Sequence, residues 1–445
     1  MTTAAPPDEN WAPAWQRYTA GVLCAFLVLA YVYVWTIQPG YGPDETRHFH
    51  YIQLLLDEHR LPLLINGQEQ GGAHTLHPPL YYLLVSPLFA LARGLGERAV
   101  YLTIKSFSPL IVLGALLLFR STLRRVFPRQ PFAVAAAFTV VALLPELQLE
   151  AAVINNDSLA ILLGSLFLWQ LARTWDAPPS VRDAALTGLI MAAFVNTKAQ
   201  GWTLAPLWAL SVGQRAVRFR TQLPAWLRDL GLGYALLLLL GTWWYVRNYQ
   251  LYGQPVPLDF MGGAVQPHSS RTGELLTPLQ VYTSGEVVTL GWRATVGLFQ
   301  SFWTQIDWIS EEYRPAIFGT LLFFCLLALS GGLWRLWQLY QDWQQGKLKA
   351  PQRLPVLSLL AGGYALNWLH TWFVATFLHL GFYQGGRYLM PSIFGAGAVL
   401  AAGWQVLTPR RAQWAVVGVL ALGLVGFNVL CLVELITYLN PKYVH

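Results

Sequence analysis

Long apolar stretches, separated by short polar or basic segments, recur along the whole chain. A helix that spans a bilayer needs about 20 predominantly apolar residues, and the pattern predicts eleven spans, several of them short. They cover residues 18–38, 98–119, 131–147, 159–173, 183–197, 200–214, 229–247, 315–337, 354–375, 388–408 and 413–436. A further apolar helix, residues 77–93, begins near a Pro-Pro pair and is predicted to lie along the outer membrane face. The pattern therefore predicts an all-α polytopic membrane bundle with short helices in the first extracytoplasmic loop.

The distribution of charge assigns each end of these helices to one side of the membrane, because short cytoplasmic loops carry an excess of Lys and Arg. With eleven spans and the N-terminus inside, seventeen of the 29 Lys and Arg residues fall on the cytoplasmic side. If residues 77–93 crossed, the basic loops 120–129 and 215–228 would face outward. The expected organisation is a cytoplasmic segment 1–17, a transmembrane domain 18–436 and an extracytoplasmic tail 437–445.

Composition supports an integral membrane protein and excludes several other classes. Apolar residues make up 55% of the 445 residues and charged residues only 11%, against roughly 25% charged in an average soluble protein. The three cysteines lie within apolar stretches, so no disulfide framework or thiolate metal site is indicated. The positive charge is sorted by membrane side, which argues against a nucleic-acid partner. No Gly-rich phosphate loop or dinucleotide fingerprint appears on the cytoplasmic side.

Function is expected in the two long outer loops, residues 39–97 and 248–314. The first loop opens with Pro43, Asp44 and Glu45. Pro43 suits the first turn of a helix, which would place both acids beside a helix N-terminus that favours ionised carboxylates. An ionised carboxylate can act as a base, and the alternative is that the pair only caps the helix. Position favours a functional role, because acids in or just above a membrane domain are costly.

Further charged residues gather at the same outer side. The acids are Glu146, Glu150 and Asp157, the last of which follows Asn155 and Asn156. The cations are Lys198, Arg247 and Arg387. Outer cations run against the positive-inside rule, and for any one of them the alternative is snorkelling toward lipid headgroups. Three cations beside an acidic cluster indicate a phosphate site, because Arg recognises phosphate with a planar fork and Lys as a point charge.

Aromatic residues make up 14% of the chain, and most of the 20 Trp residues lie near predicted span ends. This placement is typical of an interfacial belt. The exception is the run from Phe299 to Trp303, together with Trp308, in the second long loop. It suits either a sugar-stacking platform or a helix that lies on the membrane.

Taken in order, these motifs resemble the GT-C superfamily of membrane glycosyltransferases, which use lipid-phosphate-linked sugars. The resemblance rests on Pro43 to Phe49, His77 to Tyr81, Asn155 to Asp157, Thr197-Lys198, Trp244 to Asn248 and Gly386 to Pro391, with a Ser301-Phe302-Trp303…Trp308 element. The likeness is greatest to a group of uncharacterised bacterial predicted membrane proteins. It extends more distantly to protein O-mannosyltransferases and aminoarabinose transferases.

The resemblance implies a GT-C-like bundle and a role for each motif residue. Asp44 is the expected catalytic base, and Glu45 is the second acid of the catalytic pair. The donor phosphate is expected to bind Lys198, Arg247, Arg387 and Tyr388. Supporting or acceptor-binding roles are expected for His48, His77, Asn156 and Asp157. The motifs establish no cofactor, and they leave open a divalent metal ion with Glu45, His48 and Asp157 as ligands.

The implied activity is inverting transfer of a sugar from a polyprenyl-phosphate donor to a hydroxyl of a glycan, lipid or protein. It is expected at the extracytoplasmic face of a bacterial cytoplasmic (inner) membrane, as part of cell-envelope glycosylation. The loop 248–314 is too small for the large soluble domain of many superfamily members. The choice of acceptor is therefore open.

Two other classes stay open from the sequence. A transporter or flippase would hold charged groups near the midplane, on broken helices of repeated halves. In this sequence the charged residues gather at the outer ends of the predicted spans, and only Lys105 and Glu434 lie deeper in the membrane. No internal repeat is apparent. A lipid-linked glycan polymerase or ligase would also act at the outer face, but it would rely on loop arginines such as Arg387. Replacement of Asp44 separates this class from a base-dependent transferase.

Overall fold

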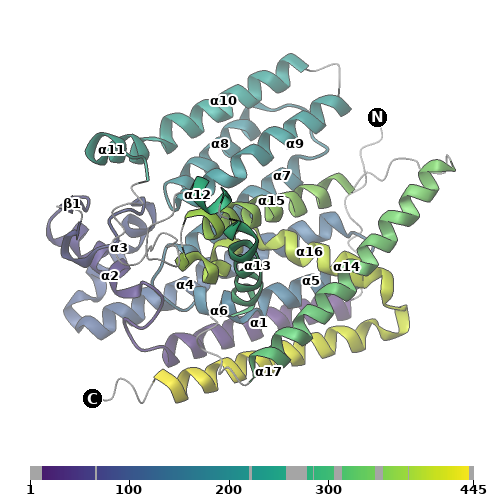
Figure 1. The fold of residues 1–445 in the computed structure, drawn as a ribbon, viewed down its shortest axis with the longest axis horizontal. Helices are drawn as coiled ribbons and strands as arrows, with labels where there is room; N and C mark the ends of the chain where they lie inside the picture. The colour runs from purple at the N-terminus through teal and green to yellow at the C-terminus, as the bar shows by residue number, and fades with distance from the viewer. Residues whose placement is uncertain are drawn as a thin grey trace.

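The computed structural model describes residues 13–65, 68–219, 223–256, 278–283, 285–304, 313–345, 354–378 and 380–439. These residues fold into one elongated bundle of helices, most of which run along the long axis of Figure 1. The β structure within these ranges is a two-stranded antiparallel ladder of β1 (Leu64–Ile65) and β2 (Gln68–Glu69). The hydrophobic pattern predicts the helices but not this ladder.

Six apolar segments in the described ranges are long enough to cross a membrane. They are α1 (Pro13–Thr36), α4 (Glu97–Val126), α10 (Leu223–Gly241), most of α14 (Arg314–Gln344), the segment Gly385–Leu407 that ends in α16 (Ile393–Leu407), and the segment Arg410–Thr437, most of which lies in α17 (Gln413–Leu439). The chain is a multi-pass membrane protein, and the count of eleven spans stays a prediction.

Shorter helices complete the bundle. They are α2 (Glu45–Asp57), α3 (Leu80–Ala92), α5 (Pro131–Ala142), α6 (Pro145–Glu150), α7 (Asp157–Thr174), α8 (Val181–Val195), α9 (Ala205–Arg218), α11 (Trp243–Tyr252), α12 (Pro278–Thr283), α13 (Glu286–Trp303) and α15 (Leu354–Phe373). Short 3₁₀ helices include η1 (Gln70–Gly72), η3 (Ala199–Leu204) and η8 (Leu380–Ser392).

Two predicted spans are divided in the structure. The span 131–147 is broken between α5 and α6, where Pro145 cannot donate a backbone hydrogen bond and so begins a new helix. The span 229–247 is broken at Thr242, between α10 and α11. Because of these breaks, Glu146 and Glu150 lie on α6 rather than on α5, and Arg247 lies on α11 rather than on α10.

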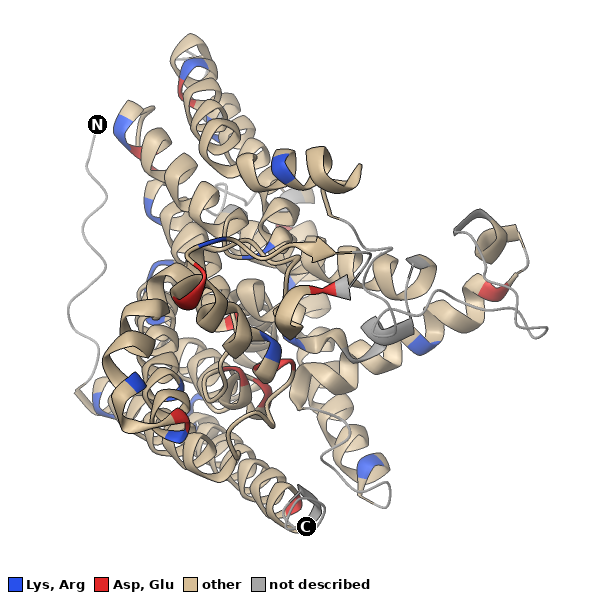
Figure 2. Ribbon diagram, turned by 90° about the vertical axis from the view of Figure 1, so that its left-hand side faces the viewer, with Lys and Arg blue, Asp and Glu red and all other residues tan. Residues whose placement is uncertain are grey.

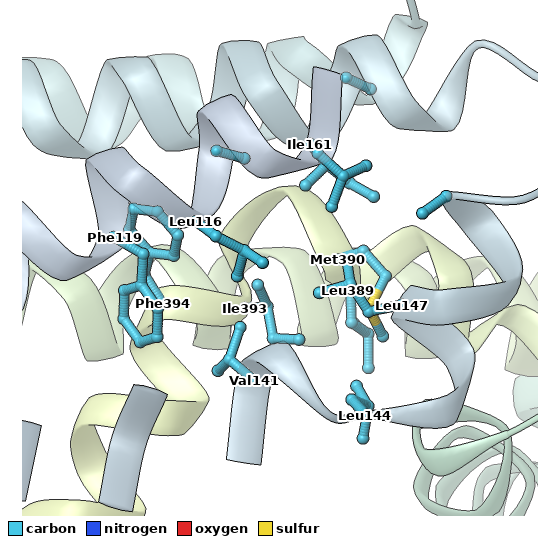
Figure 3. Close-up of a cluster of buried hydrophobic side chains, with 14 of the residues drawn as sticks. Leu116, Phe119, Val141, Leu144, Leu147, Ile161, Leu389, Met390, Ile393 and Phe394 are labelled. Atoms are coloured by element: carbon cyan, nitrogen blue, oxygen red, sulfur yellow. The ribbon is translucent and has the colours of Figure 1, made fainter. Parts of the chain in front are cut away.

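The centre of the bundle is an apolar cluster formed by α4, α5, α6, α7, η8 and α16 (Figure 3). The rings of Phe119 and Phe394 stack with centroids 4.2 Å apart. A side chain at Gly164 would place its Cβ 2.3 Å from the carbonyl oxygen of Pro391, so only glycine allows α7 and η8 to approach this closely. This packing fixes η8, which carries Arg387.

The elements α2, α3, β1 and α11 lie together at one end of the bundle (Figure 1). The loop before α2 and η8 reach the same site, where Arg387 of η8 pairs with Asp44.

The run from Phe299 to Trp303 ends α13, and Phe302 and Trp303 are buried in the core. A sugar-stacking platform on these two rings is therefore wrong, and Trp308 lies outside the described residues.

Candidate active site

Asp44 lies at the N-cap of α2 with φ 56° and ψ 11°, in the left-handed region that residues other than glycine seldom adopt. Its side chain makes no capping hydrogen bond. The carboxylate instead accepts hydrogen bonds from Arg47 Nη1 at 3.3 Å and from Arg387 Nη2 at 2.9 Å. The helix begins at Glu45, so the prediction that Pro43 occupies its first turn is wrong. Backbone strain at a polar residue is typical of functional sites.

Glycines allow the two partners of this ion pair to meet. A Cβ at Gly42 would lie 2.5 Å from the Val153 side chain, so the loop before α2 packs directly on the loop before α7. A Cβ at Gly386 would lie 2.1 Å from the Ser301 backbone, and the Gly386 N–H donates to Ser301 Oγ at 2.9 Å. Any side chain at either position would displace Asp44 or Arg387.

The electrostatic surroundings keep Asp44 ionised. Burial alone would raise the pKa of its carboxyl group, but the Arg387 guanidinium holds that pKa well below its usual range. The Asp44 side chain remains 29% exposed and that of Arg387 20% exposed. A substrate can therefore reach a permanently charged carboxylate at this site.

Glu45 has a different environment from its neighbour. Its carboxylate is fully buried and accepts backbone hydrogen bonds from Gly40 at 2.9 Å, Gly42 at 3.1 Å and Ile154 at 2.9 Å. Lys105 Nζ lies 3.6 Å from it and donates to the Ile37 carbonyl at 2.8 Å. The carboxylate therefore joins the loop before α2 to the loop before α7, 109 residues away.

We expect the Glu45→Gln variant to be strongly destabilised. The amide would present a donor to backbone N–H groups and leave Lys105 buried without its counter-charge, and breaking a buried pair costs roughly 3–5 kcal/mol. Thermal unfolding of the purified protein in detergent measures this loss. Glu58→Gln, in an exposed pair with Arg60, is the control and should change little. A Glu45→Gln protein that unfolds like the wild type but does not turn over would assign Glu45 a chemical role.

A second charged pair lies beside the first. Lys198, between α8 and η3, donates to Asp157 at the start of α7, and both side chains are buried. The Lys198 ammonium is 4.5 Å from the centroid of the Tyr388 ring, and the Arg387 guanidinium carbon is 5.4 Å from the same centroid. Asn156 Nδ2 donates to the Thr197 carbonyl at 2.9 Å and so holds the turn that carries Lys198.

The structure therefore brings together most of the predicted phosphate-binding and supporting residues. Red and blue ribbon segments meet near the middle of Figure 2, while most of the remaining helical surface is uncharged. Arg247 has other contacts: it donates to the Pro62 carbonyl at 2.9 Å, bonds to Asn248 Oδ1 at 3.2 Å and lies over the Trp244 ring. In the described residues it therefore connects α11 to the first long loop.

Three histidines form a cluster near Asp44. His48 Nδ1 is 2.8 Å from the Tyr82 hydroxyl, and His74 and His77 have ring centroids 4.0 Å apart. Burial lowers the pKa of all three imidazoles, so they are neutral. Sequence reasoning singled out His48 and His77 but not His74, although the His74-x-x-His77 spacing before a Pro-Pro pair was a usable signal.

The metal ligands expected from the sequence do not come together in the described part of the chain. Glu45 is engaged by three backbone N–H groups, and Asp157 by Lys198. Among the described residues, the His, Cys, Asp and Glu side chains that do converge closely enough are those of His48, His74 and His77.

Glu146 and Glu150 are both fully buried in α6, outside the candidate spans. Glu150 accepts a hydrogen bond from Asn155 Nδ2. Burial, reinforced by the charge of Asp157, raises the pKa of Glu150 to about 8. The carboxyl group is therefore largely protonated at neutral pH, and its unfolded-state pKa is about 4.3.

We expect the stability of the protein to fall as the pH rises from about 4.3 to about 8, because in this window the folded state holds a proton on Glu150 that the unfolded state has lost. Glu150→Gln keeps a neutral hydrogen-bonding side chain and should flatten this part of the profile. Thermal unfolding in detergent across this pH range measures the effect. The control Glu97→Gln, at an exposed site, should show the same dependence of stability on pH as the wild type. If Glu150→Gln also shows the wild-type dependence, Glu150 is not its cause.

By sequence, no protein-family model and no curated protein matches the chain. By structure, the fold is similar to that of ArnT from Cupriavidus metallidurans bound to undecaprenyl phosphate, with a TM-score of 0.54 and 16% identity, over 92% of this chain and 62% of ArnT. It is also similar to the oligosaccharyltransferase AglB from Archaeoglobus fulgidus, in complex with an inhibitory peptide and a dolichol-phosphate, with a TM-score of 0.51 and 12% identity, over 95% of this chain and 56% of AglB.

Both relatives are GT-C membrane glycosyltransferases, and the chain shares their fold. The all-α GT-C-like architecture implied by the motif order is thereby confirmed at the level of the fold. The chain spans less than two thirds of the length of either relative.

Proposed function

We propose that the protein is an inverting glycosyltransferase that moves a sugar from a polyprenyl-phosphate donor to an acceptor hydroxyl. The reaction takes place at the extracytoplasmic face of the cytoplasmic membrane. The observation that carries the proposal is the part-exposed Asp44 carboxylate paired with Arg387, next to a second cation, Lys198, over the shared Tyr388 ring. The fold supports the donor class, since one solved relative is bound to undecaprenyl phosphate and another to a dolichol-phosphate.

In this reaction Asp44 accepts the proton of the acceptor hydroxyl. The acceptor oxygen forms a bond to the anomeric carbon while the bond from that carbon to the phosphate oxygen breaks on the opposite face. The lipid phosphate leaves with the electron pair, and a phosphate needs no general acid to depart. Arg387 and Lys198 stabilise the charge that develops on it, which is worth most in a site of low dielectric.

The pairing of Asp44 with Arg387 couples base strength to donor binding. In the structure Arg387 holds the carboxylate in a weakly basic state. A donor phosphate competes with Asp44 for the same guanidinium group, because Arg binds carboxylate and phosphate with the same fork. As Arg387 turns to the phosphate, the carboxylate loses its strongest counter-charge and becomes a better base. The base is therefore activated when the donor is in place.

The other predicted residues act around this centre. Asp157 neutralises Lys198 until the phosphate arrives, and Asn156 holds the turn beside it. His48 and His77 adjoin Asp44 on the acceptor side. We assign Glu45 a positioning role, because backbone groups and Lys105 use its carboxylate. Arg247, predicted to bind the donor phosphate, holds the first long loop at Pro62 instead.

The test uses the full chain reconstituted in vesicles and a panel of radiolabelled polyprenyl-phosphate sugars. The expected result is binding of at least one donor, with slow release of its sugar to water and inversion at the anomeric carbon. Nucleotide sugars are the control donors and should not react. If no lipid-phosphate sugar binds while the vesicles move a solute, the protein is a transporter and the proposal fails.

A further inference from the structure

The histidine cluster beside Asp44 is the feature that the proposed reaction leaves unexplained. His48 comes from α2, and His74 and His77 come from the turn before α3. One ring nitrogen of each lies within 4.8 Å of one ring nitrogen of the other two. Ring centroids are 5.1 Å apart for His48 and His74, and 5.6 Å apart for His48 and His77. Three imidazoles from two elements therefore converge on one point.

The cluster is not satisfied by the protein around it. The His74 side chain is almost completely buried, and its Nδ1 has no hydrogen-bond partner in the described residues. A carboxylate oxygen of Glu69 lies 3.6 Å from this nitrogen, an electrostatic contact that is longer than a normal hydrogen bond. A buried polar atom without a partner costs roughly 1–3 kcal/mol. A bound ligand would remove that cost.

One ring is already oriented for a ligand. His48 Nδ1 is hydrogen-bonded to the Tyr82 hydroxyl at 2.8 Å, so its Nε2 is the nitrogen left to bind a ligand. The Tyr82 ring is itself fixed, because it stacks on Tyr51 with centroids 3.7 Å apart. A hydrogen bond that orients one ring nitrogen while the other binds is the usual arrangement of a metal-binding histidine.

We propose that His48, His74 and His77 bind one divalent transition-metal ion, with an open coordination position beside Asp44. Three histidines with a free fourth position are typical of catalytic zinc sites, whereas Mg²⁺ and Ca²⁺ prefer oxygen ligands. Zinc–nitrogen bonds of about 2.0–2.1 Å place tetrahedral ligand nitrogens about 3.4 Å apart. The ring nitrogens lie within 4.8 Å of one another, so side-chain rotations that bring them closer by up to about 1.4 Å complete the site.

The position of the ion gives it a chemical role. Asp44 lies one helical turn before His48, and the His48 N–H donates to the Asp44 carbonyl at 3.1 Å. An oxygen bound at the open position would have its hydroxyl acidified by the metal, and the nearby Asp44 carboxylate would take the proton. The binding of the ion stands on the histidines alone, and the acceptor hydroxyl as its oxygen ligand rests on the proposed function.

The experiment measures zinc binding to the full chain, purified in detergent with a histidine-free affinity tag and stripped with a chelator. Equilibrium dialysis against zinc, followed by elemental analysis, should give one ion per chain in the wild type. His74→Ala and the milder His74→Gln should bind zinc at least about tenfold more weakly. His50→Ala, on the same helix but outside the cluster, should bind like the wild type. Cobalt should give the intense visible absorption of a tetrahedral site in the wild type only.

Tyr82→Phe separates a metal site from a packed histidine cluster. Loss of an outer-shell partner lowers metal affinity by about 10- to 100-fold, so this variant should bind zinc weakly while its elution on gel filtration stays that of the wild type. Wild-type protein that binds no stoichiometric zinc or cobalt overturns the inference, as does an equal loss in His50→Ala. Zinc binding without sugar transfer would overturn the proposed function alone. Transfer by zinc-free protein would overturn the acceptor hydroxyl as a ligand of the ion, and absence of stoichiometric zinc from a protein that transfers sugar would overturn the metal site alone.

Discussion

Replacement of Asp44 by asparagine is expected to lower sugar transfer by about 10²- to 10⁴-fold, the usual contribution of a positioned base. Asparagine tolerates the left-handed backbone found at this position, so the loop should keep its conformation. Donor binding should persist or become tighter, because the variant no longer competes with the phosphate for Arg387. The measurement compares the initial rate of transfer with the affinity for the polyprenyl-phosphate sugar in the same preparation.

The matched control for this change is Asp57→Asn. Asp57 is an exposed acid on the same helix, and it pairs with Arg93 at 2.7 Å. It should leave both transfer and donor binding near wild-type values. Undiminished transfer in Asp44→Asn would rule out a base at this position and direct attention to a glycan ligase that relies on Arg387.

The sequence was sufficient to predict the class of fold, and it singled out the acid that the structure pairs with Arg387. Apolar periodicity and the low charge content predict a membrane bundle, and an acid placed just after the first span is informative by itself. The sequence could not distinguish Asp44 from Glu45, because both are acids at a helix start. Tertiary contacts separate them: Arg387, 343 residues away, pairs with Asp44, whereas the Ile154 N–H, 109 residues away, and Lys105 bind Glu45.

The grouping of the cations also depended on tertiary structure. The sequence alone does not distinguish the three outer cations, Lys198, Arg247 and Arg387, from one another. Arg387 reaches Asp44 because η8 packs on α13 at Gly386, where a side chain would collide with the Ser301 backbone. Arg247, on α11, instead donates to the Pro62 carbonyl of the first long loop and lies over the Trp244 ring. Helix breaks and close approaches of this kind have no reliable signature in a hydrophobic pattern.

Replacement of Arg387 by glutamine is expected to weaken donor binding by about 10- to 100-fold, because hydrogen bonds to a charged group are worth roughly 1.5–3 kcal/mol. The same change removes the strongest influence that holds the pKa of Asp44 low. The pKa of this carboxyl group should therefore rise toward its usual range, and the acid limb of the rate profile should move to higher pH. Donor titrations and pH profiles of the initial transfer rate measure the two effects.

Two further variants decide whether Arg387 acts on the donor or only on Asp44. Arg387→Lys keeps the charge but loses the planar fork that binds carboxylate and phosphate, so its donor affinity should lie between those of the wild type and Arg387→Gln. Arg93→Gln removes an exposed arginine that pairs with a carboxylate, and it should bind donor normally. If Arg387→Gln binds donor like the wild type and loses only turnover, its guanidinium group orients Asp44 and the phosphate is held by Lys198 instead.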